Sequence, residues 1–309
     1  MTPFDQLPWI VESVNEVKST LARGRLGHAV LATGTAGIGL DQLGPMLAKT
    51  ILCEQASNSS ERCSCRSCVL LAAGNHPDFL TVSREADAGV IKIKQVRELI
   101  DFLQITSHYG KRVVVVNEAD TLNLNGANAL LKTLEEPVNN AFLILLTEQP
   151  QRLLPTIQSR CQRLVVRSPS RQESDALFLA QGEADLNEYI RGRYSDRPIQ
   201  LLQWIEDGSV DRLKQWINVL AVEARANIDV LKSAATFAKV DPKQLVNWWV
   251  DYVTWLASQD RPNNAIGVHE FYQLLLAEKH RIVSGSNPNF QLVLEHMLAN
   301  WYKMVKIRS

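Results

Sequence analysis

The chain has 309 residues, which is enough for two or three domains. Its composition, with 46% hydrophobic and 21% charged residues, is that of an ordinary globular protein. Lysine plus arginine and aspartate plus glutamate both number 33, so the formal net charge is zero. This balance argues against a protein whose main task is to wrap nucleic acid, and it leaves room for local DNA contacts inside an assembly.

The N-terminal sequence and the cysteine usage indicate an intracellular location. The first six residues lack the basic segment and the long apolar core of a signal peptide. No apolar run approaches the roughly 18 residues that are needed to span a membrane. We therefore expect a cytoplasmic protein without a membrane partner, in a reducing compartment where its five cysteines do not form disulfides.

The first half of the chain alternates helical periodicity with short apolar runs, which is the pattern of an α/β fold with a parallel sheet and flanking helices. In chain order the sequence predicts a helix over residues 9–23, strands over 28–33, 79–83 and 91–93, a helix over 96–103, a strand over 113–116, a helix over 126–136, and strands over 141–146 and 162–166. Ligands of such sheets bind at the carboxyl ends of the strands. Glu118 and Thr147 fall just past two strand ends, so both are expected at that edge.

A phosphate-binding loop is indicated between the first strand and its following helix. Two glycines, Gly34 and Gly39, lie five positions apart there, with Gly37 between them. A working loop continues with a lysine, which neutralises phosphates, and with a serine or threonine, which binds magnesium. Here Leu40 and Asp41 hold these two positions. The segment is therefore either a tight glycine-rich turn or a phosphate loop that has lost its chemistry.

Four cysteines are clustered in a polar segment that follows this region. They are Cys53, Cys63, Cys65 and Cys68. Clustered thiols in a reducing compartment are typical of a tetrahedral structural zinc site, and the alternative is a set of unrelated thiols. Cys161 stands apart and is interpreted as a small buried residue.

The sequence alone assigns no catalytic or ligand-binding role to the residues of two further motifs. His76 and Asp78, on either side of Pro77, are interpreted as residues that shape a turn before the next strand. On the helix over 126–136, the apolar stripe faces the core, and Asn128, Lys132 and Glu135 lie on the other face. That polar face is either solvated or a contact surface for a partner.

The second half of the chain has only helical periodicity. Residues 168–170 predict a linker, residues 172–207 fit three short helices, and residues 210–309 fit a longer helical segment with breaks near 241–242, 261–264 and 285–288. Five of the seven tryptophans lie in this last segment and are expected in a bundle core. Adjacent helical residues point about 100° apart, so one of Trp248 and Trp249 is free to face a partner.

The sequence Asn-Ala-Leu-Leu-Lys-Thr-Leu-Glu-Glu-Pro at residues 128–137, followed by Ser159-Arg160-Cys161, resembles the AAA+ clamp-loader family of bacterial DNA polymerase III. The resemblance implies an AAA+ α/β domain over residues 1–166 with a zinc module at 53–68, a helical lid over 167–207, and a helical collar over 208–309 that mediates oligomerisation. It also implies a five-membered ring with tau/gamma and delta subunits, which uses ATP to load the sliding clamp onto primer-template DNA.

Within this resemblance the chain departs from active members at two places. The position of the usual magnesium-binding aspartate holds Asn117, which is followed by Glu118. Together with Leu40 and Asp41, this departure favours a degenerate ATPase site that does not bind ATP productively. The family implies zinc at the four cysteines, although the spacing of the last three differs by one residue and makes Cys63 the least certain ligand.

The family also implies a role for Ser159 and Arg160, which would supply an arginine finger in trans to the ATP of a neighbouring tau/gamma subunit. This chain would then be a non-catalytic component of the polymerase III holoenzyme, a nucleotidyltransferase complex. No role is assigned to Arg197, because residues 194–198 match the lid motif poorly. Two rival hypotheses are an active tau/gamma-like ATPase and a stand-alone zinc protein that binds DNA.

Overall fold

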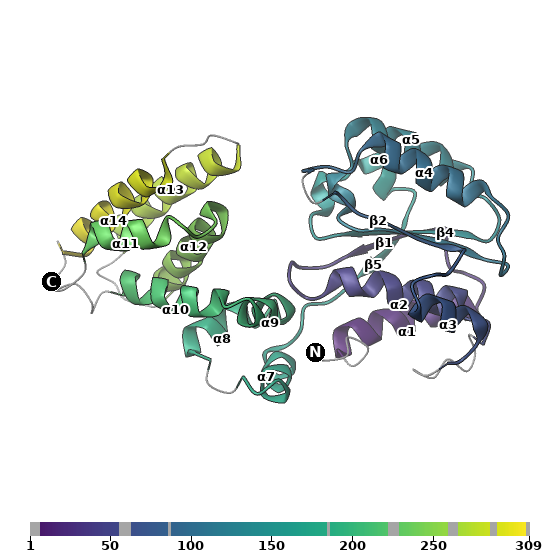
Figure 1. Cartoon of the computed structure of the whole chain (residues 1–309), viewed down its shortest axis with the longest axis horizontal. Helices are drawn as coiled ribbons and strands as arrows, with labels where there is room; N and C mark the ends of the chain where they lie inside the picture. Colours follow the sequence, from purple (N-terminus) through teal and green to yellow (C-terminus); the bar gives the residue numbers. More distant parts are fainter. Residues whose placement is uncertain are drawn as a thin grey trace. The chain divides into compact units, whose positions relative to one another are not determined.

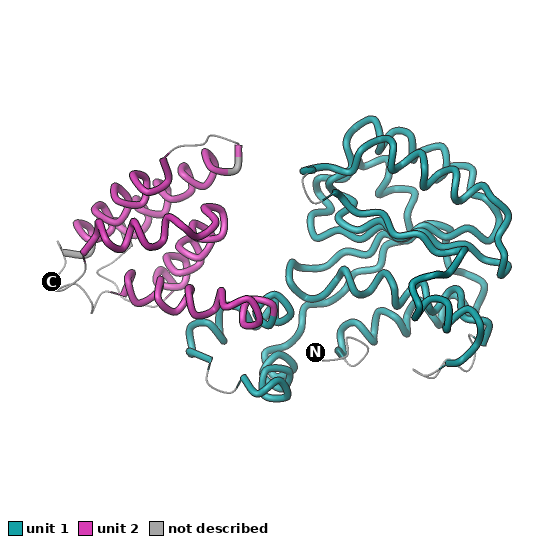
Figure 2. The backbone as a smooth tube through the Cα atoms, in the orientation of Figure 1, with its two compact units in different colours: residues 1–202 teal, residues 203–309 magenta. Residues whose placement is uncertain are grey.

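The computed structural model describes residues 7–55, 63–85, 88–183, 186–221, 229–258, 265–284 and 289–306. The chain forms two compact units, Met1–Leu202 and Gln203–Ser309 (Figure 2). The helical breaks predicted at 261–264 and 285–288 lie outside the described residues, as does the segment at 56–62 between the first two clustered cysteines. The proposed domain boundaries at 166 and 207 stay predictions.

The first unit is built on a five-stranded sheet in the order β2-β3-β4-β1-β5 (Figure 1). All its neighbouring strands are parallel. The strands are β1 (Ala29–Thr33), β2 (Phe79–Val82), β3 (Arg112–Val116), β4 (Ala141–Thr147) and β5 (Gln162–Val165). Because β1 lies between β4 and β5, the chain reverses its direction of winding beside β1, and the loop after β1 lies where such sheets bind ligands.

Helices cover both faces of this sheet, because successive strand residues point to opposite sides. In β1, Val30 and Ala32 pack into the core on one face, and Ala29 and Leu31 pack into the core on the other. The first face carries α1 (Pro8–Ala22), α2 (Leu40–Leu52) and α3 (Arg66–Ala72), and the second carries α4 (Ile93–Gln104), α5 (Leu124–Glu135) and α6 (Pro155–Gln158) (Figure 1). The predicted α/β class is confirmed.

Two local predictions were wrong. Residues 91–93 do not form a strand: Ile91 makes an isolated bridge to Leu122, and Ile93 begins α4. The reason is a helix start, since the backbone N–H of Lys92 donates to Gln95 Oε1 at 3.0 Å. Thr147 does not follow β4 but is its last residue, paired with Thr33 and buried.

Three short helices follow the sheet, as predicted: α7 (Arg171–Ala180), α8 (Glu188–Tyr194) and α9 (Pro198–Glu206). Ser170 caps α7 in a reciprocal pair with Glu173. Arg167 pairs with Glu173 at 2.7 Å and with Glu12 of α1 at 2.7 Å. These charge-assisted bonds tie the linker at 168–170 to the α/β part of the same unit.

In the part that the structure describes, the second unit is helical, with α10 (Ser209–Leu220), α11 (Val230–Phe237), α12 (Pro242–Ser258), α13 (Ala265–Val283) and α14 (Phe290–Lys306). Its core is aromatic: Trp249 lies edge-on to Trp216 at 5.1 Å between ring centroids, and Phe271 lies 5.0 Å from Trp301. Trp248 and Trp249 are 1% and 0% exposed, so the expectation that one of them faces a partner is wrong.

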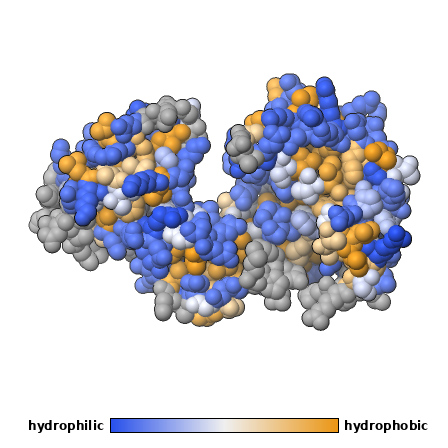
Figure 3. All heavy atoms as spheres, viewed as in Figure 1, coloured by the Kyte–Doolittle hydropathy of each residue, from blue (hydrophilic) through white to orange (hydrophobic). Residues whose placement is uncertain are grey.

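The face shown in Figure 3 mixes hydrophilic and hydrophobic side chains over both units. Large exposed hydrophobic residues are spread along the chain, among them Val69, Val165 and Leu231. Scattered apolar residues of this kind are normal for a protein surface. Within the described residues, no helix is both long and apolar enough to cross a membrane.

Candidate metal centre and degenerate nucleotide site

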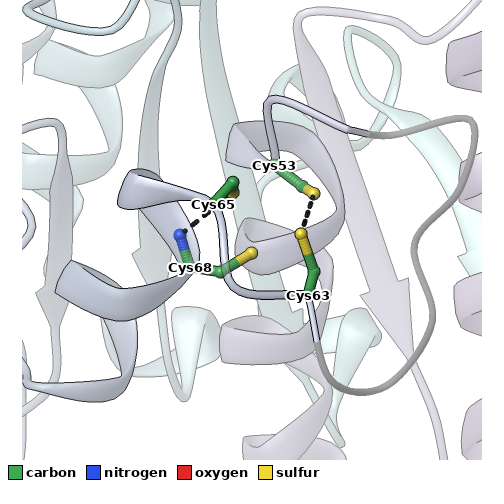
Figure 4. Close-up of side chains that lie close together, drawn as sticks. All are labelled: Cys53, Cys63, Cys65 and Cys68. Carbon is green, nitrogen blue, oxygen red and sulfur yellow. Dashed lines mark hydrogen bonds between the residues drawn. The ribbon is translucent and has the colours of Figure 1, made fainter.

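The four clustered cysteines come together as one group beside α2 and α3. Their Sγ atoms all lie within 4.8 Å of one another (Figure 4). Cys53 directly follows α2, Cys65 is the N-cap of α3, and Cys68 lies in its first turn. Cys63, the least certain ligand in the sequence, belongs to the group, and its Sγ lies 3.6 Å from that of Cys53.

The geometry of this group suits a tetrahedral metal ion. A zinc–sulfur bond of about 2.3 Å separates the sulfurs of a regular tetrahedron by about 3.8 Å. The Sγ atoms of Cys53 and Cys63 are 3.6 Å apart, and all four lie within 4.8 Å of one another. Burial opposes ionisation of Cys65, but hydrogen bonds from the backbone of Cys68 and Glu54 lower its thiol pKa to about 7. Burial raises the pKa of Cys53 and Cys68 in the absence of an ion. The four cysteines can therefore hold a metal ion that takes thiolate ligands.

His76 and Asp78 do more than shape a turn, so their interpretation from the sequence is corrected. His76 Nδ1 accepts from the backbone N–H of Asp78, and therefore its Nε2 donates to Ser67 Oγ at 2.8 Å. Asp78 is fully buried and pairs with Arg112 of β3 at 2.9 Å. This network joins α3, whose N-cap is Cys65 and whose first turn contains Cys68, to the interior strand β3.

The loop after β1, predicted as a phosphate loop, has two glycines with left-handed backbones, and Leu40 and Asp41 follow them. Gly37 and Gly39 have φ angles of 80° and 85°, the left-handed region that glycine adopts without strain. Leu40 points into the core and is 4% exposed. Asp41 is exposed in the first turn of α2, where its carboxylate accepts from Gln42 at 2.7 Å.

The chain's own groups bind this loop on several sides. The carbonyl of Gly37 accepts from the backbone N–H groups of Ile199 and Gln200 at the start of α9, at 3.0 and 3.1 Å. A Cβ atom added to Gly37 would lie 2.7 Å from Gln200 Cβ and 2.8 Å from Arg197 Cβ. The indole of Trp9 donates to the carbonyl of Ile38 at 2.9 Å. Helices α1 and α9 therefore hold the loop in one conformation.

Glu148 is a residue of this site that the sequence did not reveal. Its Oε1 accepts from the backbone N–H of Gly37 at 3.2 Å. In phosphate loops these N–H groups face the nucleotide. Partial desolvation raises the pKa of Glu148, and the charges of Asp120 and Asp41 raise it further. A carboxylate thus lies against the loop, in surroundings that repel a phosphate.

The two residues after β3 are also engaged within the chain. Asn117 donates from Nδ2 to Ser83 Oγ at 3.0 Å. Glu118 adopts a left-handed backbone with φ 48° and pairs with Arg84 at 2.7 Å. Asn117 has no carboxylate, and the carboxylate of Glu118 is paired with the guanidinium of Arg84.

Arg160 lies at the opposite edge of the sheet from this loop. It comes just before β5, whereas the loop follows β1, and these two strands are parallel neighbours. Its Nη2 pairs with Glu135 Oε1 at 2.6 Å, and its Nη1 donates to the carbonyl of Thr156 at 2.9 Å. The side chain is 34% exposed. Ser159 donates from Oγ to the same carbonyl at 3.1 Å.

Cys161 is half-buried rather than fully buried, and it packs against the core on the α5 side of the sheet. Burial raises its thiol pKa to about 11. It lies outside the group formed by the other four cysteines. Its interpretation as a small buried residue is confirmed in part, since it packs against the core but remains partly exposed.

Known proteins resemble this chain in sequence and in fold. The sequence profile of the family described as DNA polymerase III, delta subunit, matches residues 11–170. The chain is 28% identical to DNA polymerase III subunit delta' of Pseudomonas aeruginosa, over 90% of this chain and 93% of the relative. It is 41% identical to subunit delta' of Bacillus subtilis, over 47% of this chain and 44% of the relative.

The solved structures include one with the same fold. A gamma subunit-related protein of DNA polymerase III from Thermotoga maritima matches with a TM-score of 0.55 and 17% identity, over 95% of this chain and 99% of that chain. The family match covers just over half of the chain and contains the four cysteines, the degenerate loop and Arg160. On this evidence the chain belongs to the DNA polymerase III delta subunit family.

Proposed function

We propose that this chain is a non-catalytic clamp-loader subunit, equivalent to the delta' subunits that it resembles, and that it provides Arg160 in trans to the ATP of a neighbouring tau/gamma subunit. One observation carries the proposal: Arg160 is accessible at the sheet edge opposite the chain's own nucleotide loop, and that loop is closed by the chain's own groups. Arg160 thus has no nucleotide of its own to serve.

Its partners on this proposal are tau/gamma and delta subunits in a hetero-pentameric ring, and the sliding clamp and primer-template DNA through that ring. Relatives named DNA polymerase III subunit tau support the assignment, since the chain is 32% identical to that of Salmonella typhimurium over 62% of this chain and 28% of the relative. A replication role of this kind agrees with the cytoplasmic location expected from the sequence.

The assembly itself is tested by reconstitution with residues 209–309, which make up most of the second unit, removed. We expect the full chain to co-purify with tau/gamma and delta subunits, and a chain ending at Gly208 to fail to do so. Helical domains of this size can bury large apolar surfaces against neighbours. Circular dichroism provides the control, because the truncated chain must still show a cooperative thermal transition. A folded truncated chain that joins the ring at normal affinity would contradict the collar assignment of residues 208–309.

We expect no measurable ATP hydrolysis by the isolated chain and weak or no ATP binding. Residue 40 supplies no positive charge, residue 41 no hydroxyl and residue 117 no magnesium ligand, and Glu148 adds a negative charge beside the loop. Phosphoryl transfer depends on neutralising the phosphate charge, so these losses remove its main source of catalysis. Calorimetry with magnesium-ATP checks this, with a tau/gamma subunit as the binding control. Micromolar affinity would favour the rival hypothesis of an active ATPase.

The four-cysteine group is proposed to hold one structural zinc ion. Four thiolates fill the tetrahedral coordination of zinc and leave no position for a water molecule, which a catalytic zinc requires. The His76 network then connects the zinc-bound segment to β3 through Asp78 and Arg112. A free-standing zinc protein that binds DNA is the remaining rival, and it predicts strongly salt-dependent DNA binding by the isolated chain.

A further inference from the structure

We propose that Glu135 is a positioning residue for Arg160: its carboxylate fixes the guanidinium in the orientation in which it meets the nucleotide of the neighbouring subunit. The inference rests on the proposed trans role of Arg160 and deepens it by one residue. It assigns a function to one residue of the polar face of α5, to which the sequence alone assigned none.

The guanidinium of Arg160 is held from two sides by different parts of the chain. Glu135, the last residue of α5, binds Nη2 at 2.6 Å. The turn after α6 binds Nη1, through the carbonyl of Thr156 at 2.9 Å and Ser159 Oγ at 3.5 Å. These contacts use at most three of the five N–H groups of arginine, so the others stay available to an oxyanion. The side chain is thus fixed in place and still able to bind a ligand.

Helix stability does not account for an acidic residue at this position. The C-terminal end of a helix carries a partial negative charge, which disfavours a carboxylate and attracts a cation. The negative end of the α5 dipole therefore repels the carboxylate of Glu135, the last residue of the helix, and attracts the guanidinium of Arg160. Exposed ion pairs contribute little to folding, and both partners here are accessible, at 34% for Arg160 and 52% for Glu135. A role in orienting Arg160 accounts for the pair better than a role in stability.

The expected benefit of this contact is preorganisation. A free arginine side chain samples many rotamers, and each encounter with a phosphate then requires ordering of the whole side chain. A catalytic group that is already held in its productive geometry avoids this requirement at the moment of reaction. Loss of the carboxylate is therefore expected to slow turnover at the adjacent site while ATP binding there stays the same.

The test uses rings reconstituted with the full chain and compares Glu135→Gln with the matched control Glu136→Gln, which changes the exposed neighbouring glutamate. Clamp- and DNA-stimulated ATP hydrolysis is measured over a range of ATP concentrations. We expect Glu135→Gln to lower kcat at the adjacent site by about 3- to 10-fold, well short of the roughly 100-fold cost of a 1 Å misplacement, because the contacts of Arg160 with Thr156 and Ser159 remain. KM for ATP, the yield of assembled ring and the melting temperature of the isolated chain should match the wild type, and Glu136→Gln should match it in every measurement.

The double variant with Arg160→Ala separates this inference from the function on which it rests. If Glu135 acts through Arg160, its loss adds nothing once the guanidinium is gone. A further drop in kcat in the Arg160→Ala background would overturn the inference, as would wild-type or faster turnover by Glu135→Gln in a ring that Arg160→Ala slows. Reduced ring yield for Glu135→Gln would likewise overturn it in favour of a structural role. Wild-type turnover by Arg160→Ala would instead refute the trans role itself.

Discussion

Replacing Cys65 with serine is expected to abolish binding of the proposed zinc ion and to unfold the segment around α3. Serine is a good helix N-cap, so it can keep the hydrogen bond that Cys65 Sγ accepts from the backbone N–H of Cys68 at 3.4 Å. The substitution therefore removes a thiolate ligand and spares the cap. Binding of structural zinc in small zinc-finger peptides is worth roughly 10–16 kcal/mol, and most of this free energy is coupled to folding.

The measurements for this prediction are elemental analysis and thermal denaturation. We expect close to one equivalent of zinc in the wild-type chain, less than about half an equivalent in Cys65→Ser, and a melting temperature lower by at least about 5 °C, which corresponds to about 2 kcal/mol for a unit of this size. Cys161→Ser is the control, because Cys161 lies outside the group and should keep the full zinc content. Wild-type protein with less than about half an equivalent, purified under reducing and chelator-free conditions, would count against the site.

The sheet and its flanking helices follow from local sequence patterns. The run of four valines in β3 is buried on both faces, which is what a continuous β-branched run indicates in a parallel sheet. The helix that ends before Pro137 was predicted from its apolar stripe, because the 3.6-residue period is a property of neighbouring residues. The strand predicted at 91–93 was wrong because Ile93 begins a helix, at whose start Gln95 Oε1 accepts a hydrogen bond from the backbone N–H of Lys92.

The contacts that complete the candidate site are not local, and for this reason the sequence did not show them. Glu148 and Gly37, which are 111 positions apart in the chain, are joined by a hydrogen bond. Glu135 at the end of α5 pairs with Arg160, which follows α6 on the same face of the sheet. Nothing in the sequence around either glutamate distinguishes it from an ordinary solvent-exposed glutamate. His76 was likewise interpreted as a turn residue, because its partner Ser67 lies in α3, nine positions earlier, and the sequence does not show that the loop after α3 brings the two together.

The tryptophans show the same limit in the second unit. Helical geometry fixes the angle between Trp248 and Trp249, but it does not say how many sides of the helix are covered. Trp248 lies edge-on to Trp204 at 5.8 Å, and Trp249 lies edge-on to Trp216 at 5.1 Å. The side chains of both Trp248 and Trp249 are therefore covered by other residues of the same unit. The proposed ring contacts of this unit would then use other residues than these two tryptophans.

Replacing Arg160 with alanine is expected to slow ATP turnover at the neighbouring tau/gamma site on the order of 10³-fold, the lower end of the effect of arginine fingers in GTPases. Turnover of the whole ring should fall by less, since other sites keep their own fingers. The planar, permanently charged guanidinium suits the oxygens of a transferring phosphoryl group. The chain's own loop does not compete for it, because that loop lies at the opposite edge of the sheet.

If Arg160 had a purely structural role, Arg160→Ala would instead lower the stability of the chain. An arginine finger predicts no such loss. The pair with Glu135 is exposed and contributes about 0–1 kcal/mol to folding, so Arg160→Ala should leave the melting temperature and ring assembly close to wild type. Arg160→Lys is the informative second variant, because it keeps the charge and loses the planar fork, and it should recover only part of the rate. Clamp- and DNA-stimulated ATP hydrolysis by the reconstituted ring is the measurement. Wild-type turnover with Arg160→Ala, or a loss explained entirely by failed assembly, would show that the arginine does not act on the neighbour's ATP.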